Sequence, residues 1–176
     1  MQKFSFMFSF LAKLCVVSAL CLMTTHAFAK DTSASVKQNV VFEDEAGRQH
    51  SLEDYKGYNV IIISWASWCP VCVKEMVELN TAYEELLQRN AFKQNNLVIL
   101  PISLDSSSDA VAAFRQRHNM TNIPLFIDKP KNTARAFDFS RIPFGIVLDP
   151  SGKVIAKLGA SEGKSLISSL MDAVTK

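Results

Sequence analysis

Two cysteines, Cys69 and Cys72, follow directly on a continuous apolar run, and this junction constrains the fold more than any other segment. The run from Tyr58 to Trp65 is apolar and rich in β-branched residues, which is typical of a central strand covered on both faces. Apolar residues then recur at helical spacing from Cys72 to Arg89, which predicts a helix. The cysteine pair therefore lies where a buried strand is expected to turn into a helix.

The expected helix start favours a reactive first cysteine. Free backbone N–H groups and the positive end of the helix dipole both favour thiolate over thiol at Cys69. Pro70 fits the first helical turn, where its missing N–H costs nothing. Val71 then brings Cys72 round to within bridging distance of Cys69. We therefore predict reversible disulfide chemistry between the two cysteines.

The N-terminal segment has the composition of a secretory signal peptide. Met1 to Lys13 carries two lysines and no acid, Leu14 to Met23 is apolar, and Ala27-Phe28-Ala29 provides a cleavage site. The alternative is an uncleaved membrane anchor from Phe4 to Met23. In that anchor Lys13 would lie near mid-span, at a cost of about 2.5–3.5 kcal/mol.

Cleavage after Ala29 would divide the chain into three parts. We expect residues 1–29 to be removed as the signal peptide, residues 30–38 to be flexible, and residues 39–176 to form one domain. The mature chain is then expected in the periplasm, with a membrane-anchored form as the alternative. Removal of two lysines lowers the formal charge from +2 to 0, which gives no electrostatic reason to expect binding to nucleic acid or an anionic membrane.

Cysteine usage supports a chemical rather than a structural bridge. The chain has four cysteines, and Cys15 and Cys21 would leave with the signal peptide. The remaining pair closes a loop of two intervening residues. Such a bridge adds little stability, because the entropy of loop closure grows with loop length.

The rest of the mature chain alternates strands and helices, which predicts an α/β sandwich with a mixed sheet. Pro101 removes one donor from its strand, so we expect an edge or a bulge there. The expected elements are a hairpin over 40–52, a strand over 97–104, a helix over 109–118 capped by 105–108, a short strand over 124–128, a helical turn over 132–137, a hairpin of strands 144–148 and 154–158, and a last helix started by 161–163.

Four aromatic residues outside the cysteine pair are assigned from their neighbours. Trp65 is expected to pack in the core, whereas Trp68, next to Cys69, is expected on a surface that contacts a partner. His50 and His118 are interpreted as ordinary surface residues rather than catalytic ones, because nothing in the sequence pairs them with a carboxylate.

The segment Trp65–Glu75, WASWCPVCVKE, resembles the active-site segment of the TlpA/ResA/CcmG group of exported thioredoxin-fold thiol–disulfide oxidoreductases. The resemblance extends from about Phe42 to Val174 and includes residues 102–105 and 141–152. It implies a thioredoxin-like three-layer sandwich, with a mixed central sheet flanked by helices. It also implies that the cysteine pair is a redox-active disulfide and that no cofactor or metal takes part.

The resemblance assigns roles to five further residues. It implies that Ile142–Pro143 is a cis peptide facing the cysteine pair, and a cis X–Pro bond is usually placed for a purpose. The backbone of Ile142 would bind an extended partner segment, and Pro143 would keep metals from the sulfurs. Trp68, Pro70 and Val71 would contact the substrate beside it.

The proton acceptor for Cys72 is the main departure from thioredoxins. Thioredoxins proper carry a buried acid six residues before the first cysteine, where this chain has Ile63. The resemblance nominates Glu75 instead, since Glu recurs there in ResA and CcmG. Glu75 also lies three residues after Cys72, on the same helix face. The alternative is a solvated Glu favoured by the helix N-terminus.

The expected activity is thiol–disulfide exchange with disulfides of exported client proteins, in which Cys69 attacks and Cys72 resolves the mixed disulfide. The resemblance favours a reducing role, with electrons from a membrane protein of DsbD or CcdA type. Cytochrome c maturation, general disulfide reduction and a dedicated client enzyme stay open. We expect a monomer.

The alternative function is a thioredoxin-fold copper-binding chaperone using the same two thiolates, since soft thiolates suit Cu(I). Copper proteins of the Sco type space their cysteines by three residues and add a downstream His in a recognisable context. Here the spacing is two, and His118 lacks that context. A structural zinc site would need a second ligand pair, and a peroxiredoxin-like peroxidase would need a Thr-x-x-Cys arrangement.

Overall fold

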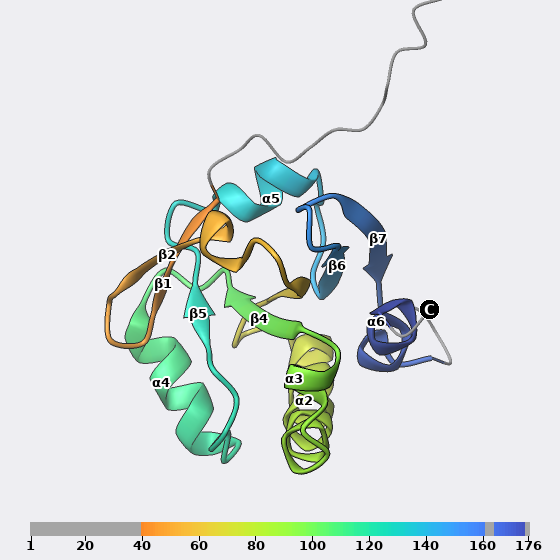
Figure 1. Cartoon of the computed structure of the whole chain (residues 1–176). Coiled ribbons are helices and arrows are strands. Elements are labelled where there is room, and N and C mark those ends of the chain that lie inside the picture. The colour runs from red at the N-terminus through yellow and green to blue at the C-terminus, as the bar shows by residue number, and fades with distance from the viewer. Residues whose placement is uncertain (1–39, 161–163, 175–176) are drawn as a thin grey trace, which may run out of the picture. The chain divides into compact units, whose positions relative to one another are not determined.

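The computed structural model describes residues 40–160 and 164–174, so the expected signal peptide and flexible segment lie outside the described residues. In chain order the elements are β1 (Val41–Asp44), β2 (Gln49–Ser51), the 3-10 turn η1 (Leu52–Tyr55), β3 (Asn59–Trp65), α2 (Pro70–Gln88), α3 (Ala91–Gln94), β4 (Leu97–Ser103), α4 (Ser108–Arg117), β5 (Phe126–Ile127), α5 (Asn132–Phe137), β6 (Phe144–Leu148), β7 (Val154–Gly159) and α6 (Leu166–Val174) (Figure 1).

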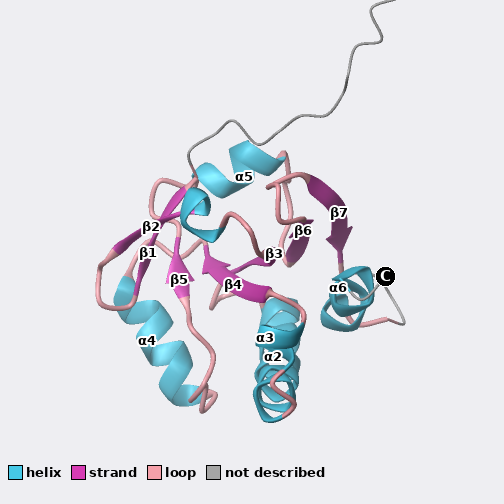
Figure 2. Ribbon diagram, in the orientation of Figure 1, coloured by secondary structure: helices cyan, strands magenta, loops and turns pink. Residues whose placement is uncertain are grey.

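The strands form one mixed sheet in the order β2-β1-β5-β4-β3-β6-β7. Strand β3 runs parallel to β4 and antiparallel to β6, and β4 runs parallel to β5. Helices α2, α4 and α6 cover one face of the sheet, whereas η1 and α5 cover the other (Figure 2). The predicted three-layer α/β sandwich with a mixed central sheet is therefore confirmed.

Strand β3 organises both halves of the core, because successive side chains of a strand point to opposite faces. Ile61, Ile63 and Trp65 pack into the cluster beneath α2, α4 and α6. Val60 and Ile62 pack into the cluster on the η1 and α5 side. All five are nearly fully buried, and burial of each such side chain contributes about 1.5–3 kcal/mol. The prediction of a strand covered on both faces is confirmed.

Pro101 lies in β4, an interior strand, so the expectation of an edge or a bulge there is wrong. The carbonyl of Ser103, which points the same way as the nitrogen of Pro101, accepts a hydrogen bond from the Asp128 N–H on the β5 side at 2.8 Å. Strand β5 pairs with β4 only at Ile102 and Ser103. Pro101 therefore lacks its N–H on a side where β4 has no strand partner at that position, so no hydrogen bond of the ladder is lost.

The remaining expected elements are present, and α5 and β6 have the expected bounds of 132–137 and 144–148, whereas others differ. Helix α4 starts at Ser108, and its cap is Ser107, whose hydroxyl accepts the Asp109 N–H at 3.1 Å. The strand expected over 124–128 is reduced to the two residues of β5. Residues 161–163, expected to start the last helix, lie outside the described residues, and α6 is observed from Leu166.

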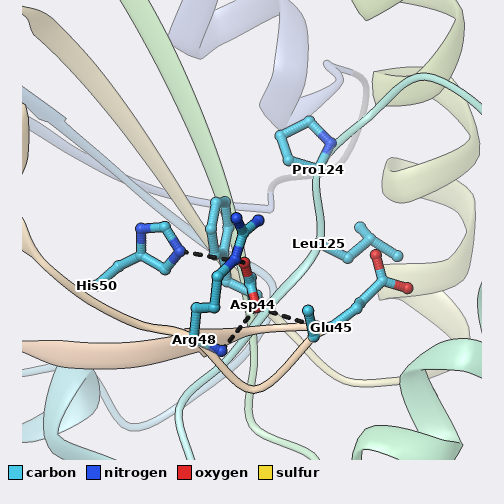
Figure 3. A pocket seen from close by; sticks show the side chains of 8 residues that line it. Asp44, Glu45, Arg48, His50, Pro124 and Leu125 are labelled. Carbon is cyan, nitrogen blue, oxygen red and sulfur yellow. Dashed lines mark hydrogen bonds and ion pairs between the residues drawn. The ribbon is translucent and has the colours of Figure 1, made fainter.

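The hairpin of β1 and β2 is closed by a polar network around Asp44 (Figure 3). The Asp44 carboxylate accepts hydrogen bonds from the backbone N–H groups of Ala46 and Arg48, each at 2.9 Å, and from Arg48 Nε at 2.7 Å. The same carboxylate lies 3.4 Å from His50 Nε2, and His50 Nδ1 lies 3.2 Å from the Tyr55 hydroxyl. His50 is therefore half-buried and has a carboxylate neighbour that nothing in the sequence indicated, while its interpretation as a non-catalytic residue stays a prediction.

The network lowers the pKa of the Asp44 carboxyl. Burial alone would raise this pKa, but the hydrogen bonds from Arg48 and His50 and the charge of Arg48 outweigh burial and lower it to about 2. A depressed pKa means that the ionised group stabilises the folded state. This stabilisation is complete above the ordinary Asp pKa of about 3.9 and is lost as the pH falls through the folded value.

Replacement of Asp44 should flatten the acid dependence of stability. The wild-type free energy of unfolding should fall as the pH drops from about 4 to about 2, because the unfolded chain then binds a proton that the folded chain does not. Asp44→Asn should be less stable at pH 7 and have a shallower slope in this window, measured by urea unfolding at a series of pH values. Glu53→Gln, at an exposed side chain paired with Lys56, is the control and should keep the wild-type slope. Equal slopes in Asp44→Asn and wild type would contradict the assignment.

Candidate active site

The cysteine pair lies at the carboxyl end of β3, where the chain turns into α2. Cys69 and Cys72 form a disulfide, with their Cα atoms 5.2 Å apart. Cys69 is the N-cap of α2, and Pro70 occupies the first helical turn. The Cys69 Sγ accepts a hydrogen bond from the backbone N–H of Cys72 at 3.3 Å. The predicted junction of strand and helix, and the predicted bridging distance, are confirmed.

The position of Cys69 at the start of α2 is electrostatically positive. The helix is 19 residues long, and its N-terminus carries the equivalent of about half a positive charge. The first turn of α2, all of it within the described chain, holds no acidic side chain that would offset this charge. After reduction of the disulfide, the dipole and the Cys72 N–H both stabilise a thiolate on Cys69 rather than a thiol.

The two cysteines differ in their access to solvent. Cys69 is 8% exposed, whereas Cys72 is fully buried. Around Cys69, Trp68 and Val71 are 68% and 54% exposed, and Pro70 is also exposed. Cys69 is therefore the sulfur nearer to an approaching molecule, and exposed apolar side chains surround the approach.

Trp65 and Trp68 lie in the two environments that the sequence predicted. Trp65 is fully buried, and its ring packs on that of Phe114 at a centroid distance of 4.5 Å. Trp68 is exposed, as expected for a surface residue. Its contact with a partner stays a prediction. His118 also contacts Phe114, at a ring distance of 4.5 Å, and is half-buried at the end of α4.

Strand β6 brings a cis peptide to the cysteine pair. The Ile142–Pro143 bond is cis, as the resemblance implied. Ser64 pairs with Phe144 in the antiparallel β3–β6 ladder, so the residues just before β6 lie beside the end of β3. The carbonyl oxygen of Ile142 lies 4.0 Å from the Cys69 Sγ. Two segments more than seventy residues apart in the chain therefore form one site.

Glu75 is buried, so the alternative of a solvated side chain is wrong. Its carboxylate accepts hydrogen bonds from the Ser165 hydroxyl and the Leu166 N–H, each at 3.3 Å, and from the Ile167 N–H at 3.4 Å. These donors lie at the N-terminus of α6, where a carboxylate is favoured by the helix dipole. The acid that follows Cys72 on α2 therefore joins α2 to α6.

Ser67, in the turn before Cys69, is held by a carboxylate that the sequence analysis assigned to a helix cap. Asp105 does not cap α4. Instead, its side chain accepts hydrogen bonds from the N–H and the hydroxyl of Ser67, each at 2.9 Å. Asp105 also accepts one from the Ser103 hydroxyl at 2.6 Å. The sequence carried no signal for this contact, because Ser67 and Asp105 are 38 residues apart.

The described residues hold no group of three or more His, Cys, Asp or Glu side chains that could bind a metal ion. In the same residues no helix combines the length and the apolar character that a bilayer crossing requires.

Curated relatives of this chain include thiol–disulfide oxidoreductases named ResA. ResA of Bacillus subtilis is 28% identical over 136 residues, which cover 77% of this chain and 72% of ResA. ResA of Geobacillus kaustophilus is 27% identical over 133 residues, covering 74% of this chain and 72% of that protein.

Solved structures with the same fold include proteins named as disulfide oxidoreductases. The thioredoxin domain of a thiol–disulfide oxidoreductase from Bacteroides vulgatus superposes with a TM-score of 0.62 at 26% identity, covering 81% of this chain and 97% of that domain. A secreted disulfide oxidoreductase of Mycobacterium tuberculosis, described as homologous to DsbE, superposes with a TM-score of 0.61 at 14% identity, covering 77% and 93%. The second likeness supports the fold alone.

These similarities confirm the predicted resemblance and the predicted enzyme class, thiol–disulfide oxidoreductase. The thioredoxin-like sandwich and the disulfide at the start of α2 agree with them. Since residues 28–157, more than half of the sequence, match the AhpC/TSA family, the chain belongs to the AhpC/TSA family of thioredoxin-fold proteins.

Proposed function

We propose that this protein is exported and reduces disulfides of exported client proteins through Cys69 and Cys72. The observation that carries the proposal is the disulfide at the N-terminus of α2, with the Ile142 carbonyl 4.0 Å from Cys69 Sγ. A sulfur at a helix start, less buried than the second sulfur behind it, has the geometry that disulfide exchange requires. The names of the ResA relatives support the same chemistry.

The proposed reaction starts from the reduced pair. The Cys69 thiolate attacks one sulfur of a client disulfide, forms a mixed disulfide with it, and displaces the other client sulfur as a thiolate. Cys72 then loses its proton and attacks Cys69 Sγ. This step forms the Cys69–Cys72 disulfide and displaces the second client thiolate. Both client thiolates take up protons, so the client gains two electrons that the cysteine pair loses.

The proposed client site is the exposed rim around Cys69. Trp68, Pro70 and Val71 would contact the client from the α2 side. The half-buried Ile142 would offer its backbone to an extended client segment from the other side, with Pro143 fixing the direction of that backbone. An extended segment placed between these two sides would bring its disulfide to Cys69.

Export and the reducing direction are supported by less direct observations. The composition of residues 1–29 is that of a signal peptide. Export would place the protein in the periplasm. We propose that it acts there as a monomer. We infer a membrane electron donor of DsbD or CcdA type, since an exported reductant must be re-reduced after each turnover. Cytochrome c maturation is one pathway that such a reductant would serve.

The two cysteines should differ when each is replaced. Cys69→Ser should abolish reduction of a small disulfide, because no accessible thiolate is left to attack it. Cys72→Ser should still attack, and should accumulate a mixed disulfide on Cys69 that mass spectrometry detects. Replacement of Cys15 and Cys21 by serine, in the expected signal peptide, is the matched control and should leave turnover unchanged. Unchanged turnover in both Cys69→Ser and Cys72→Ser would refute the proposed function.

We also propose that Glu75 accepts the proton of Cys72, since it is buried and lies three residues further along α2. Glu75→Gln keeps an oxygen that can accept from α6, but it loses the base. The resolving step should slow by about 100-fold at neutral pH, the scale of general-base catalysis. The loss should shrink above about pH 8.5, where a cysteine ionises unaided.

The pH–rate profile of single-turnover exchange measures this effect. Glu78→Gln, one turn further along the same helix, is the control and should reproduce the wild-type profile. A profile of Glu75→Gln that matches the wild type at every pH would limit Glu75 to its contact with α6.

A further inference from the structure

A buried carboxylate at the end of β4 contacts the turn that precedes Cys69, and the mechanism described above does not use it. Asp105 is 4% exposed. Its Oδ2 accepts the Ser67 N–H at 2.9 Å and the Ser103 hydroxyl at 2.6 Å, and its Oδ1 accepts the Ser67 hydroxyl at 2.9 Å. Two of these three hydrogen bonds come from Ser67, two residues before the accessible cysteine.

We propose that Asp105 is a positioning residue for thiol–disulfide exchange. Its carboxylate holds the turn from Ala66 to Cys69, and thereby keeps Cys69 Sγ aligned with the N-terminus of α2. The inference rests on the proposed function, because alignment of Cys69 matters only where its sulfur reacts.

The register of the sheet brings the carboxylate to the turn. Trp65 pairs with Ser103 in the parallel β3–β4 ladder, and the Leu104 N–H donates to the Trp65 carbonyl at 2.8 Å. The two strands therefore end side by side. The residue that follows β4 then lies next to the turn that follows β3, which places Asp105 against Ser67.

The turn itself is fixed at both ends. The Cys69 N–H donates to the Ala66 carbonyl at 3.2 Å and closes the turn. Asp105 holds Ser67 inside that turn by both backbone and side chain. Beyond the turn, Cys69 Sγ accepts the Cys72 N–H at 3.3 Å. Release of Ser67 would free the turn and weaken this last hydrogen bond, on which the thiolate depends.

The burial of Asp105 explains why its carboxylate is hydrogen-bonded to the turn. Burial of a carboxylate without compensation is costly, so its oxygens must be satisfied by hydrogen bonds or a cation. No ion pair found within residues 40–160 and 164–174 involves Asp105. The hydrogen bonds from Ser67 and Ser103 supply the compensation instead, and hydrogen bonds to a charged group are among the stronger ones.

The direction of one effect separates positioning from a simple charge effect. If Asp105 acted only through its negative charge, its removal would stabilise the Cys69 thiolate and lower the pKa of that thiol. If Asp105 holds the turn, its removal weakens the alignment with α2 and raises the pKa of the same thiol. If Asp105 has a structural role that does not reach Cys69, its removal would leave the pKa of that thiol unchanged.

The test measures alkylation of Cys69 by iodoacetamide in the reduced full chain, as a function of pH. Mass spectrometry of the peptide that contains Cys69 reports this sulfur alone. In Asp105→Asn the midpoint should move up by about one pH unit, equivalent to about tenfold less thiolate at any pH well below the midpoint. The rate of reduction of oxidised glutathione at a pH below the midpoint should fall by less, about three- to fourfold, because a thiolate of higher pKa is also more nucleophilic. Asp109→Asn, at an exposed acid in the first turn of α4, should leave both quantities unchanged.

An unchanged or lowered midpoint in Asp105→Asn would overturn the proposal. If Asp105→Asn does not fold, Ser67→Ala decides, because it keeps the buried carboxylate and removes one of its three hydrogen bonds. A smaller upward shift is then expected, and no shift would again overturn the proposal. Alkylation requires no disulfide substrate. Failure of the wild-type protein to reduce oxidised glutathione would therefore refute the proposed function, while the alkylation profile still tests Asp105.

Discussion

The hydrogen bond from the Cys72 N–H to the Cys69 sulfur is the contact on which the proposed chemistry depends. It exists because α2 begins at Pro70, immediately after a cap whose side chain is a sulfur instead of the usual oxygen. A helix start stabilises an anion there, and a thiolate is the reactive form of cysteine. The sheet, the neighbouring helices and the loops around the pair can all be understood by how they fix this helix start.

Four segments far apart in the sequence meet at that point. Strand β3 delivers the turn that carries Cys69, and β4 delivers the carboxylate that holds it. Strand β6 presents the carbonyl of Ile142 beside the sulfur. Glu75, one turn beyond Cys72, ties α2 to the N-terminus of α6. Each contact is made at the end of a strand or helix, where the backbone position is set by a rigid element.

Local patterns predicted the parts of this arrangement that depend on neighbouring residues. The apolar run before Cys69 and the helical spacing after Cys72 gave the junction its correct place, and the resemblance supplied the cis bond at Pro143. Contacts between distant residues were missed. Glu75 meets α6 some 90 residues later, and Asp105 was assigned to a cap because its partner is 38 residues earlier. The contact of His50 with Asp44, six residues earlier, was also missed, although the hairpin itself was predicted.

The ionisation of Cys69 tests most directly whether the start of α2 activates this sulfur. The absorbance of a thiolate at 240 nm can be titrated in reduced protein carrying Cys72→Ala, which keeps the backbone N–H that reaches the Cys69 sulfur. The pKa of the Cys69 thiol should lie clearly below the ordinary cysteine value of about 8.5. A pKa at or above that value would contradict the claim that the start of α2 activates this sulfur.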